Sequence, residues 1–123
     1  GGSCGVPGLI AIAVSTNASV ANANAIQAGQ LDAGLAGAQT VVQSYNGEGK
    51  FVGNKKDKIR VIANLYPESM HLVLKKGMKL NSLKDLNGKK VGVAAAGSGT
   101  QVSYAQLSST IVRLRFVPLR SVR

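Results

Sequence analysis

The sequence has few aromatic residues and few residues that can carry out chemistry. Aromatic residues make up 4% of the 123 residues, tryptophan is absent, and the chain has one histidine and one cysteine. Cys4 cannot form an internal disulfide and has no Cys or His partner at metal-ligand spacing. The acidic residues are well separated, so neither a carboxylate pair nor a Ser-His-Asp arrangement is present. These absences predict that the protein is not an enzyme and that it needs no cofactor and no metal.

A long apolar run is also missing. The given sequence has no run of about 18 apolar residues and no signal peptide, which excludes a membrane span within it. Gly1-Gly2-Ser3-Cys4-Gly5 loosely resembles the cleavage site of a lipoprotein, although no apolar segment precedes it. We expect any export signal to lie outside the given sequence.

Positive charge is absent from the first part of the chain. Residues 1–49 contain no Lys or Arg, although the net charge of the whole chain is +10. All 15 basic residues lie at position 50 or later, and they occur in small groups beside predicted strands. Two interpretations remain open for these groups. They are either solvated turn residues or a face that binds a polyanion such as nucleic acid.

The apolar pattern predicts alternating strands and helices. Short apolar runs bounded by Gly, Pro, Asn or Ser predict buried strands, and N-cap residues followed by helical spacing predict helices. The predicted order is β-α-β-α-β-β-α-β-α, which indicates an α/β fold with a mostly parallel sheet flanked by helices. The expected strands are 9–14, 32–37, 59–66, 70–74 and 89–94, and the expected helices are 20–28, 38–45, 83–86 and one that begins near Ser98.

We divide the chain into an α/β lobe and a tail. The lobe spans residues 6–107. Residues 108–123 form an Arg-rich tail with four arginines and no acid, whereas the lobe uses Lys almost exclusively. This change in composition indicates a non-native origin, such as a reading-frame change or an assembly artefact. The alternative is an edge strand over residues 111–119.

Residues 89–100 predict a strand that passes through a glycine turn into a helix. A helix N-terminus directs free backbone N–H groups and the positive end of its dipole at one region, so this junction is suited to an anion. Further polar residues follow the other strands, and the carboxyl ends of parallel strands are where ligands bind in α/β sheets. The candidate ligand-binding residues are therefore Thr16, Asn17, Ser19, Gln39, Tyr66, Gly97, Ser98, Gly99 and Thr100.

No reactive centre accompanies these residues. His71 stands in the apolar run 70–74, where we expect a half-buried strand histidine rather than a general base. Gly97-Ser98-Gly99 lacks the outer glycines of a G-x-S-x-G nucleophile elbow. The turn is not a phosphate loop either, since no Lys-Ser or Lys-Thr follows it. The residues therefore indicate binding without catalysis.

Several linked motifs resemble the TAXI family, the solute-binding proteins of tripartite ATP-independent periplasmic (TRAP) transporters. The similarity runs from about Val6 to Leu107. The motifs that carry it, in order, are Val6-Pro7-Gly8-Leu9, residues 19–32 (SVANANAIQAGQLD), Leu65-Tyr66-Pro67-Glu68, His71-Leu72-Val73, residues 83–91 (LKDLNGKKV) and Gly97-Ser98-Gly99-Thr100.

The resemblance implies a type II periplasmic-binding-protein fold, here as a partial lobe. It also implies capture of a small organic anion, such as glutamate or a related dicarboxylate, and delivery to the membrane permease subunits of the transporter. The expected location is periplasmic or extracytoplasmic, including anchoring as a lipoprotein. Ser19, Tyr66, Ser98, Gly99 and Thr100 match cleft-facing motifs of the family. Gln39 stands where the family often has a Gln-Ser-Asp turn, but the acid is absent.

The chain departs from the family pattern at both ends. The resemblance implies a missing N-terminal strand and helix and a missing second lobe. A sheet without its inner strand would leave unpaired backbone and exposed apolar faces, so we expect a marginally stable fragment with weak affinity. The competing hypothesis is a small basic nucleic-acid-binding domain. It predicts DNA or RNA binding that weakens steeply with salt.

Overall fold

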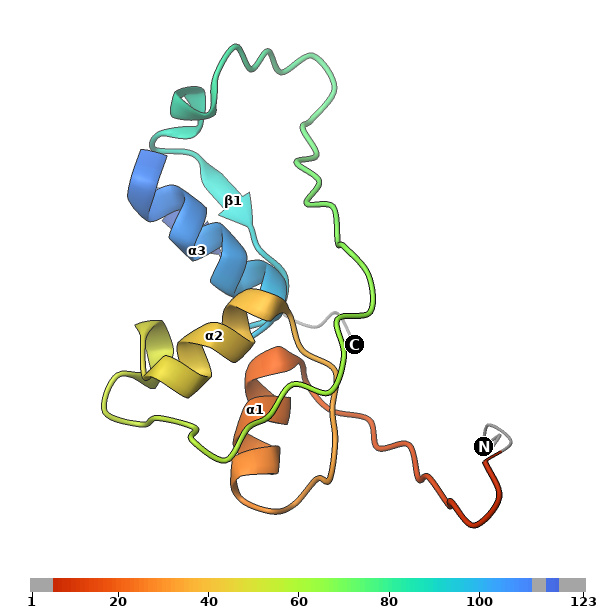
Figure 1. The fold of residues 1–123 in the computed structure, drawn as a ribbon. Coiled ribbons are helices and arrows are strands. Elements are labelled where there is room, and N and C mark those ends of the chain that lie inside the picture. Colours follow the sequence, from red (N-terminus) through yellow and green to blue (C-terminus); the bar gives the residue numbers. More distant parts are fainter. Residues whose placement is uncertain (1–5, 112–114, 118–123) are drawn as a thin grey trace.

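The computed structural model describes residues 6–111 and 115–117. Figure 1 shows three helices grouped around one junction and a long connecting segment that loops away from them. The described elements are α1 (Ser19–Gln27), α2 (Ala38–Asn46), the 3-10 helices η1 (Gly49–Phe51) and η2 (Leu83–Leu86), β1 (Lys90–Gly92), α3 (Gly99–Ile111) and β2 (Arg115–Val117).

The three α-helices lie where the sequence predicts them. α2 ends at Gly47, whose φ of 73° is a left-handed conformation that favours glycine. The short helix predicted at 83–86 is the 3-10 helix η2. Its start is fixed by Asp85, whose carboxylate accepts hydrogen bonds from the N–H groups of Asn81 and Ser82 at 2.8 and 3.1 Å. Local capping and turn signals therefore determine these elements.

The helices pack around a small apolar core. Ala23 of α1, Phe51 of η1 and Ile59 are buried together, and partly buried Val20, Ile26 and Val41 pack against them. This core joins α1 and α2 to the segment that follows η1. Another set of buried apolar residues belongs to η2, to the end of β1 and to α3, and consists of Leu86, Val93, Val102 and Tyr104.

Most of the predicted parallel sheet is not seen in the described residues. The sheet that they form has two strands, β1 and β2, which pair in parallel with Val91 opposite Phe116. The segments 9–14, 32–37, 59–66 and 70–74 form no strand. Ile59 is buried in the core, but most of the other large apolar side chains lie exposed: Ile10 is 87% exposed, Ile62 88% and Val73 88%. A buried strand needs hydrogen-bonded neighbours at its edges, and these segments have none here.

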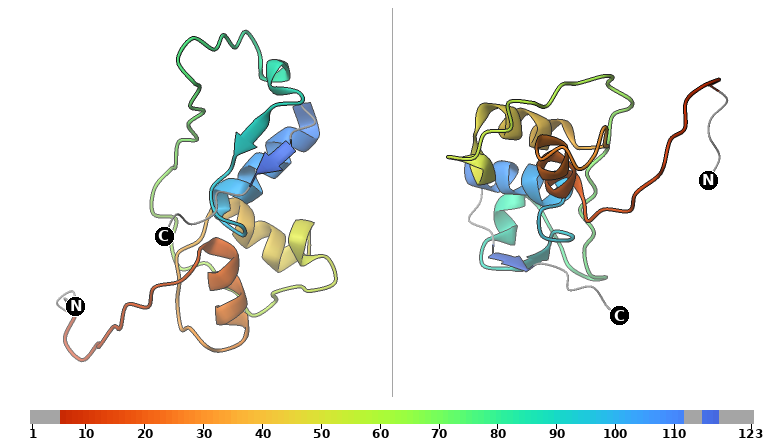
Figure 2. Two further views of the ribbon diagram at one scale, coloured as in Figure 1. Left: turned by 180° about the vertical axis from the view of Figure 1, so that it is seen from behind. Right: turned by 90° about the horizontal axis from the view of Figure 1, so that it is seen from below.

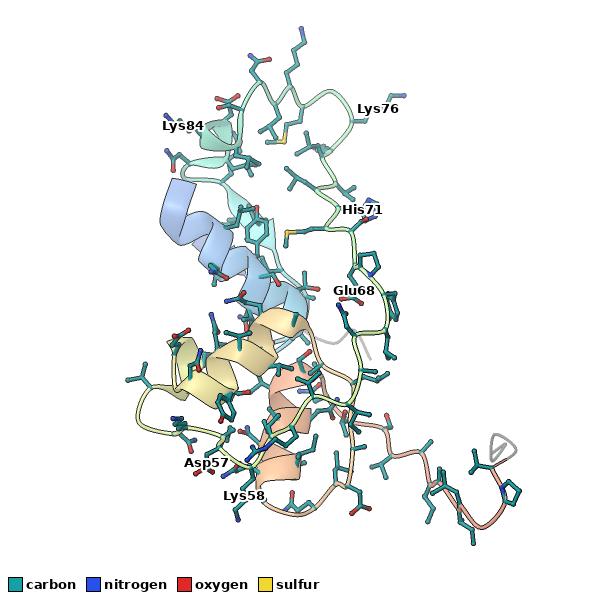
Figure 3. All side chains as sticks on the ribbon, in the orientation of Figure 1. Asp57, Lys58, Glu68, His71, Lys76 and Lys84 are labelled. Atoms are coloured by element: carbon teal, nitrogen blue, oxygen red, sulfur yellow. The ribbon has the colours of Figure 1, made fainter. Side chains whose placement is uncertain are left out.

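The segment between the helices and β1 explains much of this exposure. Figure 2 shows from behind that residues from about 60 to 82 form a wide loop beside the helices. His71 lies on this loop (Figure 3) and is exposed, so the expected half-buried strand position is wrong.

The tail contributes the strand that pairs with β1. Residues 115–117 form β2, in keeping with the edge-strand alternative for residues 111–119. The expected non-native origin of residues 108–123 remains a prediction, and residues 112–114 and 118–123 lie outside the described part.

Within the described ranges, no helix is long and apolar enough to cross a membrane. The same residues contain no group of three or more His, Cys, Asp or Glu side chains placed to hold a metal ion.

Candidate functional site

The first residues of α1, α2 and α3 meet at one point, which we call the helix junction (Ser19, Gly37 and Gly99). Ser19 begins α1, and its Oγ accepts a hydrogen bond at 3.1 Å from the N–H of Gly37, which precedes α2. A Cβ added to Gly99, the first residue of α3, would lie 3.0 Å from that Oγ and 3.8 Å from the Cα of Gly37. Figure 1 shows the same convergence of the three helix ends. A side chain at position 99 would require Ser19 Oγ to shift by a few tenths of an ångström.

The helix junction gathers backbone N–H groups that have no partner. Within the described residues, the N–H groups of Ala38 and Gln39 in α2 make no hydrogen bond, nor do those of Gly99 and Thr100 in α3. Each helix also directs the positive end of its dipole at the same region. N–H groups and dipoles of this kind bind anions without a charged side chain.

The glycine turn before α3 is held against α1. The carbonyl of Gly97 accepts the N–H of Val20 at 3.2 Å. Gly97 has a φ of +78°, and an added Cβ would lie 3.4 Å from the Val20 Cβ. Ser98 then caps α3, because its Oγ accepts the N–H of Gln101 at 3.1 Å. These contacts fix the direction in which the N-terminus of α3 points.

Gln101 completes the turn, and it is absent from the residues predicted from the sequence. Its Oε1 accepts the N–H of Gly97 at 2.8 Å and the Nζ–H of Lys50 at 2.6 Å. Ser98 and Gln101 have the S-x-x-Q spacing of a capping box, in which the second side chain reaches back to a backbone N–H. That spacing is the signal that would have identified Gln101. Lys50 has no comparable local signal, since 51 positions separate it from Gln101.

Two alanines with positive φ stand beside the helix junction. Ala18, directly before α1, has φ 149° and ψ −166°, and Ala94, after β1, has φ 63°. Glycine populates these regions freely, whereas alanine in them is strained. Backbone strain of this kind is concentrated at functional sites, so it adds to the case for the helix junction.

The carboxylates of Asp57 and Asp85 form hydrogen bonds outside the helix junction. The Asp57 carboxylate accepts a hydrogen bond from Gln27, the last residue of α1, and this bond holds its pKa below the ordinary value. The pKa of Asp85 is lowered by the N–H groups of Asn81 and Ser82 before η2. Burial raises the pKa of the Tyr104 phenol in α3. No described hydrogen bond brings a carboxylate to Ser19, Gly37 or Gly99, so an anion there meets no acidic hydrogen-bond partner.

The comparison with protein families agrees with a site that binds without catalysis. The model of the NMT1-like family matches residues 7–113. The chain belongs to the NMT1-like family. This is a family of the periplasmic solute-binding type, whose members are binding proteins rather than enzymes and are typically extracytoplasmic. No solved structure matches the chain.

The family has a periplasmic-binding-protein-like fold, in which a sheet supports the helices. The described residues contain three α-helices and the paired strands β1 and β2. The larger sheet of this family fold is not seen here, and most of the segments expected to form it are exposed.

The helix junction brings together part of the predicted site. Ser19, Gly97, Ser98 and Gly99 lie there through the contacts given above. Gln39 and Thr100 stand on the first turns of α2 and α3, where their N–H groups are free. Each of these residues stays a predicted ligand contact, because their binding role is untested.

The other predicted residues are placed elsewhere. Thr16 donates its hydroxyl hydrogen to Asn22 Oδ1 at 2.5 Å, and Asn22 Nδ2 in turn donates to the carbonyl of Leu35 at 2.7 Å. Asn17 is exposed, and Tyr66 is 64% exposed on the wide loop. Within the described residues Tyr66 makes no hydrogen bond to the helix junction.

An open hollow of about 320 Å³ lies between residues 12–16 and 31–35. Its lining is mostly apolar and belongs to two of the segments predicted as strands. Thr16 is the one predicted site residue that lines it. We place the candidate anion site at the helix junction instead, because the free N–H groups are there.

Proposed function

We propose that this member of the NMT1-like family is an extracytoplasmic solute receptor that captures a small organic anion. The observation that carries the proposal is the convergence of the three helix N-termini at Ser19, with free N–H groups on α2 and α3 and no acidic partner. A carboxylate fits such a set, since each of its oxygens accepts more than one hydrogen bond. The family's solute-binding type supports this function.

The finer assignment follows the sequence resemblance. We infer that the receptor belongs with the TAXI proteins of TRAP transporters and that its solute is glutamate or a related dicarboxylate. Its partners would then be the membrane permease subunits. The proposed ligand contacts are Ser19, Gln39, Gly97, Ser98, Gly99 and Thr100 at the helix junction, and Thr16, Asn17 and Tyr66 around it.

We expect the affinity to be weak. The described residues offer N–H donors on one side of the site. A carboxylate bound there keeps much of its surface exposed to water. A dissociation constant on the order of 1 mM corresponds to about 4 kcal/mol, which a few charge-assisted hydrogen bonds can supply. The measurement must therefore work at high ligand concentration.

Nuclear magnetic resonance titration tests the proposal at the level of single N–H groups. L-glutamate, L-glutamine and succinate are added separately to the isotope-labelled chain. We expect the amide signals of Ala38, Gln39, Gly99 and Thr100 to shift in a saturable way with at least one of them. Equal shifts with sodium chloride at matched ionic strength would refute a carboxylate site. A duplex DNA arm tests the competing nucleic-acid hypothesis, which predicts binding that weakens with salt.

A further inference from the structure

A second surface lies at the end of α2 remote from the helix junction. The segment from Glu48 to Arg60 contains five basic and two acidic residues. Figure 3 shows Asp57 and Lys58 of this segment beside the lower ends of α1 and α2, far from Lys76 and Lys84 on the opposite side of the molecule. Asp57 accepts a hydrogen bond from Gln27 Nε2 at 3.0 Å, and within the described residues it forms no ion pair with the neighbouring lysines. Asp57 interacts electrostatically with Lys58 and Lys55, and the segment keeps an excess of basic over acidic residues.

Two of these cations are fixed on one aromatic ring. Lys55 Nζ lies 5.7 Å from the centroid of the Tyr45 ring, and the guanidinium carbon of Arg60 lies 5.9 Å from it. Arg60 Nη1 also donates to the carbonyls of Asp57 and Ile59 at 2.6 and 2.8 Å. Cation–π attraction holds the two like charges near each other, and the Asp57 carboxylate, which interacts electrostatically with Lys55, offsets part of their repulsion. An approaching anionic surface would relieve that repulsion.

An exposed apolar side chain lies in the same segment. Phe51 is 2% exposed and anchors the turn in the core, whereas the next residue, Val52, is 74% exposed. Gly49 and Gly53 on either side both have positive φ, which makes the turn tight. An aliphatic group among flexible cations is typical of surfaces that lie against lipid headgroups.

We infer that this surface, the basic face (Tyr45, Val52, Lys55, Lys58 and Arg60), docks onto a bilayer that contains anionic phospholipid. A headgroup layer offers phosphates at no fixed spacing, which suits long basic side chains on an exposed segment. Single-stranded nucleic acid is less well matched, because base stacking needs free aromatic faces and two cations already lie over the Tyr45 ring. Each basic residue near such a surface contributes about 1 kcal/mol, so docking is weak and reversible.

Vesicle sedimentation tests the basic face. The full chain is mixed with phosphatidylcholine vesicles, either pure or containing about 30% phosphatidylglycerol to give the negative surface potential. We expect binding to the anionic vesicles alone, and release by salt as screening increases. Lys55→Gln with Arg60→Gln should weaken partitioning about thirtyfold. The control pair Lys76→Gln with Lys84→Gln removes the same amount of charge outside the basic face. It should change the partitioning onto anionic vesicles by less than about threefold.

A further variant guards against a simple loss of folding. Val52→Glu changes a highly exposed side chain, so the fold should persist by circular dichroism while docking falls. If the two charge-matched double variants lost vesicle binding equally, net charge alone would explain the binding, and the inference would be overturned. Binding to neutral vesicles that equals binding to anionic vesicles would overturn the inference too. So would binding of the basic face to duplex DNA or poly-glutamate that is tighter than its binding to anionic vesicles. The amide titration at the helix junction is independent of all these outcomes.

Discussion

The hydroxyl oxygen of Ser19 accepts a hydrogen bond from the backbone N–H of Gly37 at 3.1 Å, joining the start of α1 to the residue before α2. Gly99 of α3 approaches the same oxygen so closely that a Cβ there would lie 3.0 Å from it. One small side chain thus sets the spacing of three helix ends. The separation of the free N–H groups on α2 and α3 depends on this contact.

Ser19→Ala should weaken both the fold and the site. Loss of the acceptor leaves the N–H of Gly37 without its partner, at a cost of about 1 kcal/mol. We expect a lower thermal midpoint and smaller amide shifts with L-glutamate. Ser69→Ala on the exposed wide loop is the control. Unchanged titration curves in Ser19→Ala would mean that the helix junction does not hold the solute.

Gly99→Ala tests the close approach of α3. The added methyl group would press on Ser19 Oγ, so we expect loss of stability of about 1–3 kcal/mol, as for an overpacked site. The double variant Ser19→Ala/Gly99→Ala removes the oxygen that is in the way. It should be more stable than the sum of the single changes predicts, a coupling that thermal or denaturant unfolding can measure. Additive effects would contradict direct contact. Thr100→Ala serves as a control on the same helical turn.

The helices could be predicted from the sequence because their signals are local. Gly47 supplies the left-handed residue that ends α2, and Asp85 caps η2 through two neighbouring N–H groups. The sheet depends on partners distant in the chain. The apolar run at 9–14 has the composition of a buried strand, but composition does not say whether an edge partner is present, and none pairs with it among the described residues.

The candidate site was predictable where polar residues begin helices. Ser19, Ser98 and Gly99 carry N-cap or turn signals, and the structure brings them together. Gln101 has a capping-box spacing that identifies it afterwards, but its link to Lys50 spans 51 positions and needs the packed helices. The sequence predicts Tyr66 at the end of a strand, and without that strand it lies 64% exposed on the wide loop.

Ala18→Gly should stabilise the protein. Ala18 has φ 149° and ψ −166°, a region populated almost only by glycine. Relief of this strain is expected to exceed the entropic cost of glycine and to raise the free energy of unfolding by about 1 kcal/mol. Ala28→Gly is the control, because Ala28 has a helical φ of −78° and should lose stability on the same change. A lower denaturation midpoint for Ala18→Gly would refute the strain at this position.

Gln101→Ala should loosen the glycine turn. The change removes the acceptor of the Gly97 N–H and of Lys50 Nζ, with distances of 2.8 and 2.6 Å. We expect faster hydrogen exchange at Gly97 and weaker solute binding, whereas Gln101→Glu keeps an acceptor and should retain the protection of Gly97. Equal exchange rates in Gln101→Ala and the wild type would show that Gln101 does not position the turn.

Asp85 makes the stability of the fold depend on pH in the acidic range. Its carboxylate accepts hydrogen bonds from the N–H groups of Asn81 and Ser82, which lowers its pKa in the folded state below the ordinary value of 3.8. The group is ionised in both states above that value, so its stabilising contribution is fully present at neutral pH. It is lost as the pH falls through 3.8 and then through the lower folded pKa.

Asp85→Asn should therefore be less stable than the wild type at about pH 7, and the difference should shrink toward about pH 3. Thermal unfolding followed by circular dichroism across this range measures the effect, with Asp32→Asn as an exposed control. A difference that stays constant with pH would show that the ionised carboxylate does not stabilise η2.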